Sequence, residues 1–281
     1  KGIKPFGEDA INFLDFQELV LNMQIQKEKI IDRATEMMKD DKIIIIYDRG
    51  AIDNLAYMSE EEFKEILNRL NNVNTFGELM NKYDLVINLV GRQDFYTTEN
   101  NKARTESANE AIKLGEKALK SWLGHPKIKI VLPKEKMEEK IQEVLNIINE
   151  EIKERQVKRQ EKYLIDLSKT DINLIKQNGK IVYIKQDYLI SKEDIEKRIR
   201  EVEINGSKTY QLSVYKIMKD GTRIIISEKE IDKKIYENLL EFKEENTKTI
   251  NKTRIYFNYE GTYLYIDIFE NEETLGILEI N

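Results

Sequence analysis

Two patterns of apolar residues divide the chain. Between Asp9 and Glu154, apolar residues recur at helical spacings of three and four, and short all-apolar runs interrupt them. Such runs fit strands buried on both faces of a parallel sheet, because β-branched side chains pack well on a pleated surface. Beyond residue 156 the pattern alternates, which is typical of antiparallel strands. The sequence therefore predicts two domains, 1–155 and 156–281.

The first domain is expected to be a parallel α/β layer, since strand-type runs and helical stretches follow one another. The most apolar run, I-I-I-I-Y-D-R-G at Ile43–Gly50, predicts a buried strand that ends at D-R-G. Two further strands are predicted at Leu85–Val90 and Lys127–Leu132, with helices over Asp9–Lys39, from Ser59 onward, and over Glu135–Glu154.

Ligands of open α/β sheets bind beyond the carboxyl ends of the strands, which is where this pattern puts Asp48 and Arg49. Two interpretations stay open: an acid near magnesium and phosphate, or a strand end where both residues merely pair or cap. The loop F-Y-T-T-E-N-N-K-A-R-T-E-S lies on the same predicted rim. It offers Tyr96 for stacking on a base and Arg104 for phosphate, unless it is an ordinary solvated loop. The lone His125, before a proline, is more typical of a structural loop residue than of a general base.

The second domain is expected to be a closed or nearly closed antiparallel barrel. Turn dipeptides fall at Asn178-Gly179, Asn205-Gly206, Asp220-Gly221 and Glu260-Gly261, and helices are predicted only at Lys192–Lys197 and Asp232–Asn246. The predicted strands are Tyr163–Leu167, Ile181–Leu189, Arg198–Glu203, Tyr210–Lys216, Thr222–Ile226, Thr253–Tyr259, Tyr263–Phe269 and Leu275–Ile280.

Basic residues repeat at a spacing of two along several of these strands, so that their side chains share a face. Arg198 and Arg200 form one such pair, and Lys252 and Arg254 form another. A polar interior lined by these cations suits a polyanion. The alternative for any single strand is a sandwich whose basic side chains face water.

Composition narrows the classes of function. The net charge of −6 argues against a chain-wide nucleic-acid binder, because neutralising phosphates needs a basic surface. The absence of cysteine excludes disulfides and thiolate zinc sites and suits a reducing compartment. No apolar run approaches the ~20 residues of a membrane span, and no signal peptide is visible, so a cytoplasmic location is expected. The chain begins with Lys1 rather than Met, from which we expect further sequence upstream.

Several stretches of the first domain together resemble the P-loop ATPase/kinase-like family that includes the ribosylnicotinamide-kinase domain. The closest branch contains nucleotide- and phosphoinositide-binding proteins implicated in TRP-channel trafficking. The resemblance implies ATP or GTP binding, with Mg²⁺ near Asp48 and Arg104 as a lid-type arginine near the phosphates. The phosphate-binding sequence G-x-x-x-x-G-K-[ST] occurs nowhere in the 281 residues, which departs from the family. The matching stretches are F-Q-E, Y-D-R-G-A-I-D-N-L-A-Y-M, K-Y-D-L-V-I-N-L-V, F-Y-T-T-E-N-N-K-A-R-T-E-S and S-W-L-G-H-P.

Residues 158–281 resemble the CYTH superfamily, the triphosphate-tunnel fold of class IV adenylate cyclases and thiamine triphosphatase. The matching stretches include Y-I-K-Q-D-Y-L, K-R-I-R-E, D-G-T-R-I, N-K-T-R-I-Y-F and Y-I-D-I-F. The resemblance implies a tunnel that binds anions through Lys162, Arg198, Arg200, Arg223, Lys252 and Arg254.

The family's metal-binding carboxylates are largely replaced in this chain. Its E-x-E-x-K signature reads Lys158, Gln160 and Lys162, so the lysine is kept and both acids are lost. Its R-x-E-x-E reads Arg223, Ile225 and Ser227, although Glu228 would face inward if a bulge intervened. A divalent cation needs several oxygen ligands, and Glu279 remains as a weak metal candidate beside Asp267.

We therefore expect a two-domain protein that binds a nucleotide, a phosphoinositide headgroup or a triphosphate, without efficient hydrolysis in the tunnel. Mg²⁺ is expected only together with a nucleotide, and no nucleic-acid partner is expected. One alternative is an enzyme, either a metal-dependent triphosphatase or a P-loop small-molecule kinase or NTPase. Another is an inert scaffold in which both sites have decayed.

Overall fold

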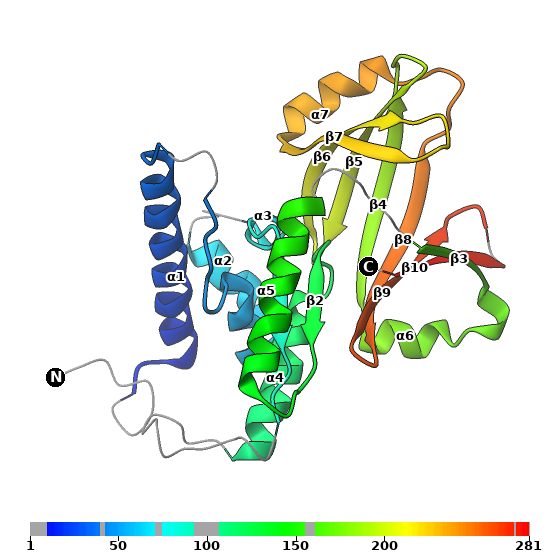
Figure 1. Ribbon diagram of the computed structural model, residues 1–281. Helices are drawn as coiled ribbons and strands as arrows, with labels where there is room; N and C mark the ends of the chain where they lie inside the picture. Colours follow the sequence, from blue (N-terminus) through cyan, green and yellow to red (C-terminus); the bar gives the residue numbers. More distant parts are fainter. Residues whose placement is uncertain are drawn as a thin grey trace.

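The computed structural model describes residues 10–39, 43–70, 75–92, 107–154, 161–272 and 274–280. Helices surround a short parallel sheet in the N-terminal region, and a long, strongly bent antiparallel sheet forms the C-terminal region (Figure 1). The predicted boundary near residue 156 lies outside the described residues. It therefore stays a prediction.

The N-terminal helices begin where the sequence supplies side-chain caps. Ser59, Thr75 and Ser107 each accept a hydrogen bond from the backbone three residues on, and a glutamate at that position bonds back. These reciprocal bonds satisfy backbone N–H groups that a helix start leaves unpaired. The elements are α1 (Phe13–Glu36), η1 (Ala51–Tyr57), α2 (Glu60–Arg69), α3 (Phe76–Asn81), β1 (Val86–Leu89), α4 (Ala108–Trp122), β2 (Ile128–Val131) and α5 (Met137–Glu154).

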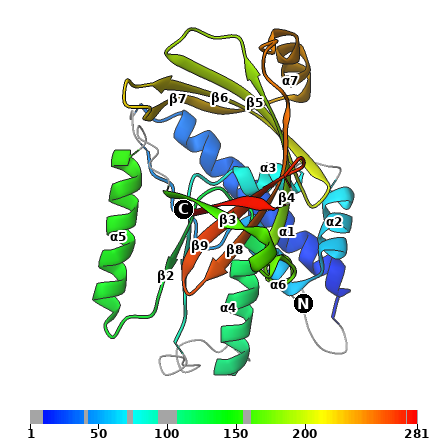
Figure 2. The same ribbon diagram turned by 90° about the vertical axis from the view of Figure 1, so that its right-hand side faces the viewer.

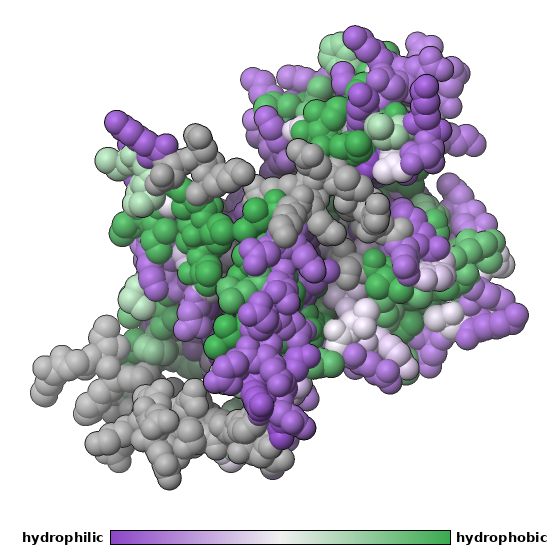
Figure 3. Space-filling model, in the orientation of Figure 1, coloured by the Kyte–Doolittle hydropathy of each residue, from purple (hydrophilic) through white to green (hydrophobic). Residues whose placement is uncertain are grey.

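The predicted buried strand at Ile43–Tyr47 is wrong. The parallel sheet consists of β1 and β2 alone among the described residues, and no strand pairs with residues 43–47. Ile44 is 60% exposed and Ile46 is 77% exposed. A strand needs a neighbour for its backbone N–H and C=O groups, and β-branched composition does not supply one. Figure 3 shows apolar surface over the part of the molecule where α1 and this segment lie.

All eight strands predicted for the C-terminal region are present, and they form one antiparallel sheet in the order β3-β10-β9-β8-β4-β5-β6-β7. Tight turns at Asn205-Gly206, Asp220-Gly221 and Glu260-Gly261 join consecutive strands, as predicted. The elements are β3 (Glu161–Asp166), η3 (Leu167–Lys169), α6 (Ile172–Asn178), β4 (Lys180–Leu189), β5 (Ile195–Ile204), β6 (Ser207–Ile217), β7 (Arg223–Ile231), α7 (Lys233–Leu239), η4 (Leu240–Phe242), β8 (Ile250–Tyr259), β9 (Thr262–Phe269) and β10 (Leu275–Ile280).

Three expectations for this region need correction. The sheet is not closed into a barrel, because β3 and β7 form its two edges and do not pair within the described residues. The predicted helix at Lys192–Lys197 is absent, since pairing with β4 and β6 draws residues from Ile195 onward into β5. Asn178-Gly179 ends α6 and leads into β4 rather than turning a hairpin.

One hydrophobic core joins the two regions. It contains Leu21, Phe63 and Trp122 from the N-terminal helices and Val182 and Tyr263 from the sheet. The Tyr263 hydroxyl accepts a hydrogen bond from Gly124 N and donates one to His125 O, at 3.1 and 2.7 Å. The N-terminal helices therefore pack against one end of the sheet (Figure 2).

A second, smaller core lies on the opposite face of the sheet. It packs Tyr236 of α7 against Leu189, Ile199 and Tyr210. Because Ile199 lies between Arg198 and Arg200 on β5, the strand directs its isoleucine to α7 and both arginines to the other face.

Candidate functional site

The register of the C-terminal sheet gathers the predicted cations on one face. Gln186 on β4 lies opposite Arg200 on β5, and Arg254 on β8 lies opposite Asp267 on β9. Directly opposed residues in an antiparallel pair share a face. We call this side the cation face, defined by the cations Lys162, Arg198, Arg200, Arg223, Lys252 and Arg254.

Asp267 forms the centre of the cation face. Its carboxylate is 98% buried and accepts hydrogen bonds from Arg254 Nε and Nη2 at 2.6 and 2.8 Å. Lys252 Nζ lies 2.5 Å from the same carboxylate. The Arg254 guanidinium also stacks over the Tyr265 ring at 3.7 Å from its centroid. Two cations thus share one acid, and a planar aromatic contact holds one of them in place.

Arg198 is held by a phenol and an acid. Its Nη2 donates to the Tyr215 hydroxyl at 2.6 Å, and its Nη1 lies 3.5 Å from Glu196. The Tyr215 hydroxyl donates to Glu228, which reaches the cation face through the β-bulge foreseen from the sequence. Arg198 Nε is buried and has no hydrogen-bond partner among the described residues. One donor of a nearly buried guanidinium is therefore unsatisfied.

Arg200 is the exception among these cations. Its Nε donates to Gln186 Oε1 at 2.8 Å, and the Gln186 side chain is buried. No carboxylate lies within 4.0 Å of Arg200 among the residues that the structure describes. A neutral amide therefore orients this arginine without cancelling its charge.

The two outermost cations are more exposed and are paired with acids. Lys162 on β3 lies 3.1 Å from Glu279, whose carboxylate also accepts a hydrogen bond from Tyr265. Arg223 on β7 lies 3.0 Å from Glu196. Their side chains are 51% and 47% exposed, so solvent and ligands reach both edges of the face.

The crowding of positive charge shifts the pKa values of the site. Burial and the neighbouring Arg254 lower the pKa of Lys252 to about 8, against the pull of Asp267. Burial and Arg198 lower the pKa of Arg200 to about 10. Burial alone would raise the pKa of Asp267, but Arg254 and Lys252 outweigh it and hold that pKa below its ordinary value. Like charges therefore repel one another here, which favours an added anion.

The expectation that the face had shed its acids is only partly right. Glu196 and Glu228 join Asp267 and Glu279, and each of the four contacts a cation or a phenol of the cluster. In Asp267 and Glu279 these contacts engage both carboxylate oxygens, which a divalent ion would need. No group of three or more His, Cys, Asp or Glu residues in the described chain is arranged to hold a metal. The acids of this face therefore do not fit a Mg²⁺ site.

Of the four N-terminal site residues predicted from sequence, the structure describes two, Asp48 and Arg49. Asp48 is exposed and has no hydrogen bond or ion pair within the described ranges, while Arg49 is exposed and adopts a positive φ of 73°. Tyr96 and Arg104 lie outside the described residues. Without the strand at 43–47, nothing holds Asp48 at the end of a sheet.

Asp53, which the sequence analysis did not single out, anchors this loop instead. Its carboxylate accepts hydrogen bonds from Gly50 N at 2.8 Å and from Trp122 Nε1 at 3.1 Å. A Cβ added to Gly50 would lie 2.8 Å from the Trp122 ring, so the loop packs closely on the indole. The bond to Gly50 is local, three residues apart, whereas the bond to Trp122 is tertiary, and no local spacing in the sequence could have indicated it.

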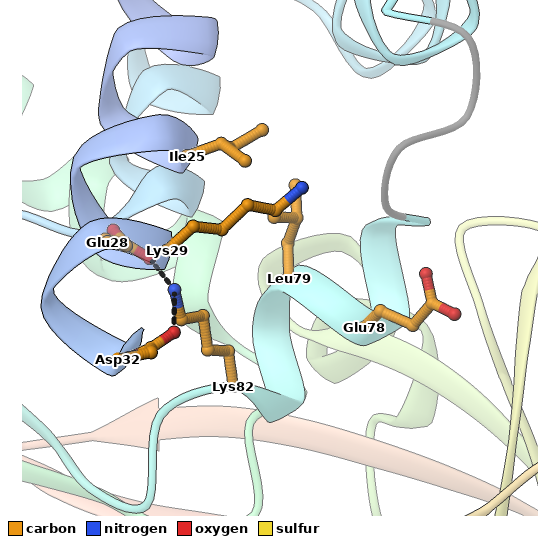
Figure 4. Close-up of a pocket in the computed structure, with 7 residues that line it drawn as sticks. All are labelled: Ile25, Glu28, Lys29, Asp32, Glu78, Leu79 and Lys82. Atoms are coloured by element: carbon orange, nitrogen blue, oxygen red, sulfur yellow. Dashed lines mark ion pairs between the residues drawn. The ribbon is translucent and has the colours of Figure 1, made fainter. Parts of the chain in front are cut away.

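A cleft of about 240 Å³ lies beside this loop, between α1 and α3 (Figure 4). Lys82 lies 2.9 Å from Glu28 and 3.0 Å from Asp32, as the dashed lines show. Glu28 is fully buried and also accepts a hydrogen bond from Tyr83 at 2.7 Å. Lys82 is thus already neutralised, and the lining holds three acids against two lysines, so the cleft is a weaker anion site than the cation face.

His125 is structural, as predicted. It is fully buried, with Nε2 donating to Tyr83 O at 2.7 Å and Nδ1 accepting from Lys127 N at 3.0 Å. Burial lowers its pKa, so the ring stays neutral. Both nitrogens serve the backbone and neither is available as a general base.

Residues 5–140 match the family model described as an AAA domain. This AAA-matching region contains the D-R-G loop, α4 and the parallel sheet. The comparison with curated proteins finds no match. No helix among the described residues is both long and apolar enough to cross a bilayer.

The C-terminal sheet is similar to solved structures of archaeal proteins. One is the PH1819 protein from Pyrococcus horikoshii OT3, with 22% identity, a TM-score of 0.34, and coverage of 44% of this chain and 78% of that chain. Another is a conserved hypothetical protein from Pyrococcus furiosus, with 20% identity, a TM-score of 0.34, and coverage of 45% and 78%.

Proposed function

We propose that the cation face binds a phosphorylated ligand and does not hydrolyse it efficiently. The observation that carries this proposal concerns two neighbouring arginines: among the described residues, Arg198 Nε is buried without a hydrogen-bond partner, and Arg200 has no carboxylate within 4.0 Å. A buried donor or charge without a partner costs free energy. A phosphoryl oxygen, which accepts charge-assisted hydrogen bonds from guanidinium groups, would satisfy both residues.

The contacts of the carboxylates on the cation face support ligand binding rather than hydrolysis. In-line phosphoryl transfer relies on cations or metal ions that neutralise developing charge and on a group that orients the nucleophile. Here Asp267, Glu279, Glu196 and Glu228 are each already engaged by a cation or a phenol. The candidate ligands are a nucleotide, a phosphoinositide headgroup and a triphosphate.

For the AAA-matching region we propose binding of ATP or GTP, supported by the family match. Mg²⁺ would accompany that nucleotide. Asp48 is the candidate acid in the described residues, and its exposure leaves it accessible to a bound ion.

Calorimetric titration with inorganic phosphate, inositol phosphates and nucleotides tests the site. Arg198→Met should weaken binding at least tenfold, which is about 1.4 kcal/mol. Lys197→Met is the matched control, because it removes the same charge from the other face of β5 and should leave binding unchanged. Equal affinities for the wild type and both variants would remove the proposal.

Phosphate release distinguishes the enzyme alternative. We expect no release from tripolyphosphate, thiamine triphosphate or ATP above the buffer rate, with Mg²⁺ or Mn²⁺. Turnover that disappears in Glu279→Gln would instead establish a metal-dependent triphosphatase.

A further inference from the structure

Arg200 differs from the other cations of the face because its partner is the amide of Gln186 and not a carboxylate. Lys162, Arg198, Arg223, Lys252 and Arg254 each lie within 4.0 Å of a carboxylate. Arg200 instead contacts the amide oxygen of Gln186, its direct partner in the β4–β5 ladder. Both strands belong to the middle of the sheet, so the backbone fixes this pairing.

Whether residue 186 is a glutamine or a glutamate decides the net charge of the cation face. The six cations and the four carboxylates that contact them leave an excess of two positive charges at pH 7, and Glu230, opposite Gln211 on the same face, bonds to Asn81 instead. Glutamate has nearly the shape of glutamine and would reach Arg200 Nε in the same way. It would, however, cancel one of the two uncompensated charges and form a buried ion pair.

We propose that Gln186 is the specificity-determining residue of the cation face: by orienting Arg200 without neutralising it, Gln186 matches the face to one dianionic phosphate group. This inference rests on the proposed function and names the ligand class of the same site. Two excess charges balance one phosphate dianion, whereas a triphosphate carries more negative charge than the face leaves uncompensated.

The direction of the dipole supports this role. Arg200 Nε is a donor and Gln186 Oε1 is the acceptor, so the amide points its negative end at the guanidinium. Arg198, whose Nε is buried without a partner among the described residues, lies two residues from Arg200 on the same face of β5, and the two cations repel each other. Two neighbouring guanidinium groups offer the fork geometry that phosphate oxygens fit.

The test is Gln186→Glu, titrated calorimetrically with inorganic phosphate and with tripolyphosphate at pH 7.5, and unfolded thermally without ligand. We expect phosphate affinity to fall at least tenfold while the apparent melting temperature stays equal or rises. If Gln186 were merely structural, Gln186→Glu would not lower phosphate affinity while the melting temperature stays equal or rises. Gln186→Met, which keeps the face positive but releases Arg200, should bind phosphate more tightly than Gln186→Glu.

Tyr183→Glu is the matched control, because it adds one negative charge at an exposed position on the other face of β4. It should bind phosphate like the wild type. Equal losses in Tyr183→Glu and Gln186→Glu would overturn the inference, as would full affinity in Gln186→Glu. Tripolyphosphate that binds the wild type more than 100-fold tighter than phosphate would overturn the assignment to a single dianion. A wild type that binds no phosphate compound would instead overturn the proposed function itself.

Discussion

The two regions treat their charged residues in opposite ways. In the N-terminal region, Glu28, Lys82 and Asp53 are engaged in contacts within the region, Arg49 lies 3.9 Å from Asp53, and Asp48 stays exposed. In the C-terminal sheet, six cations meet on one face and exceed their acids by two charges. The first region therefore satisfies its polar groups internally, whereas the second keeps an excess of positive charge that is available to an anionic ligand.

The difference follows from how each region places its strands. In the long sheet, every strand pairs with its neighbours. Residues two apart on one strand share a face, and the register places them opposite the residues of the adjacent strands on that same face. The isoleucine run at 43–47 has no ladder to join, and the acid that follows it is left in solvent. A charged residue becomes part of a site only where backbone pairing fixes its position.

The largest expected effect comes from removing the central acid of the sheet. Asp267→Ala would leave Lys252 and Arg254 nearly buried without their carboxylate, at a cost of about 3–5 kcal/mol. Urea unfolding measures the loss. Millimolar phosphate should restore part of it, because an added anion replaces the carboxylate and binds only the folded state. An unchanged midpoint would mean that solvent already screens these charges.

A smaller effect is expected where the two regions meet. Tyr263→Phe removes the hydroxyl that bridges Gly124 N and His125 O and leaves both groups without that partner. We expect a loss of about 1–3 kcal/mol in chemical unfolding. The transition should stay single, because the shared core still couples the regions. Two separate transitions in the wild type would contradict that coupling.

The pH dependence of the cation face should follow Lys252. Its pKa of about 8 lies below the ordinary 10.5, so between these values the unfolded state binds more protons than the folded state. The free energy of unfolding should therefore gain a rising contribution from pH 8 upward. Phosphate affinity should fall about tenfold over the same range, because the neutral amine no longer attracts the anion. Titrations from pH 7.5 to 9.5 measure this, and Lys252→Arg, which stays charged, should flatten the profile.

The smallest effect is expected at the exposed isoleucine run. Ile46→Lys should change the free energy of unfolding by less than about 0.5 kcal/mol, since that side chain is largely in solvent. Ile66→Lys, at a fully buried site of α2, is the comparison and should be severely destabilising. A loss above about 2 kcal/mol at Ile46 would show that this residue is buried as a strand after all.

Much of the second region could be read from the sequence. Alternation placed its eight strands, three turn dipeptides placed hairpins, and a spacing of two correctly grouped Arg198 with Arg200. The pairing of Arg200 with Gln186 could not be read, because the 190–194 connection between β4 and β5 contains no Asn-Gly or Asp-Gly dipeptide to indicate the hairpin register. Glu196 was likewise visible only once the ladders were known, whereas the inward position of Glu228 was indicated from the sequence on condition of the bulge that the structure contains.

The sequence by itself determined the helix starts, through hydroxyl caps and glutamates three residues apart, and the strand faces, through alternation. These are local properties, settled within a few residues by backbone geometry and side-chain reach. Only the tertiary structure decided that the isoleucine run stays exposed, that the sheet remains open, and that a glutamine meets Arg200. Each of these depends on which distant segment supplies a hydrogen-bonding neighbour, and local physical chemistry does not specify that choice.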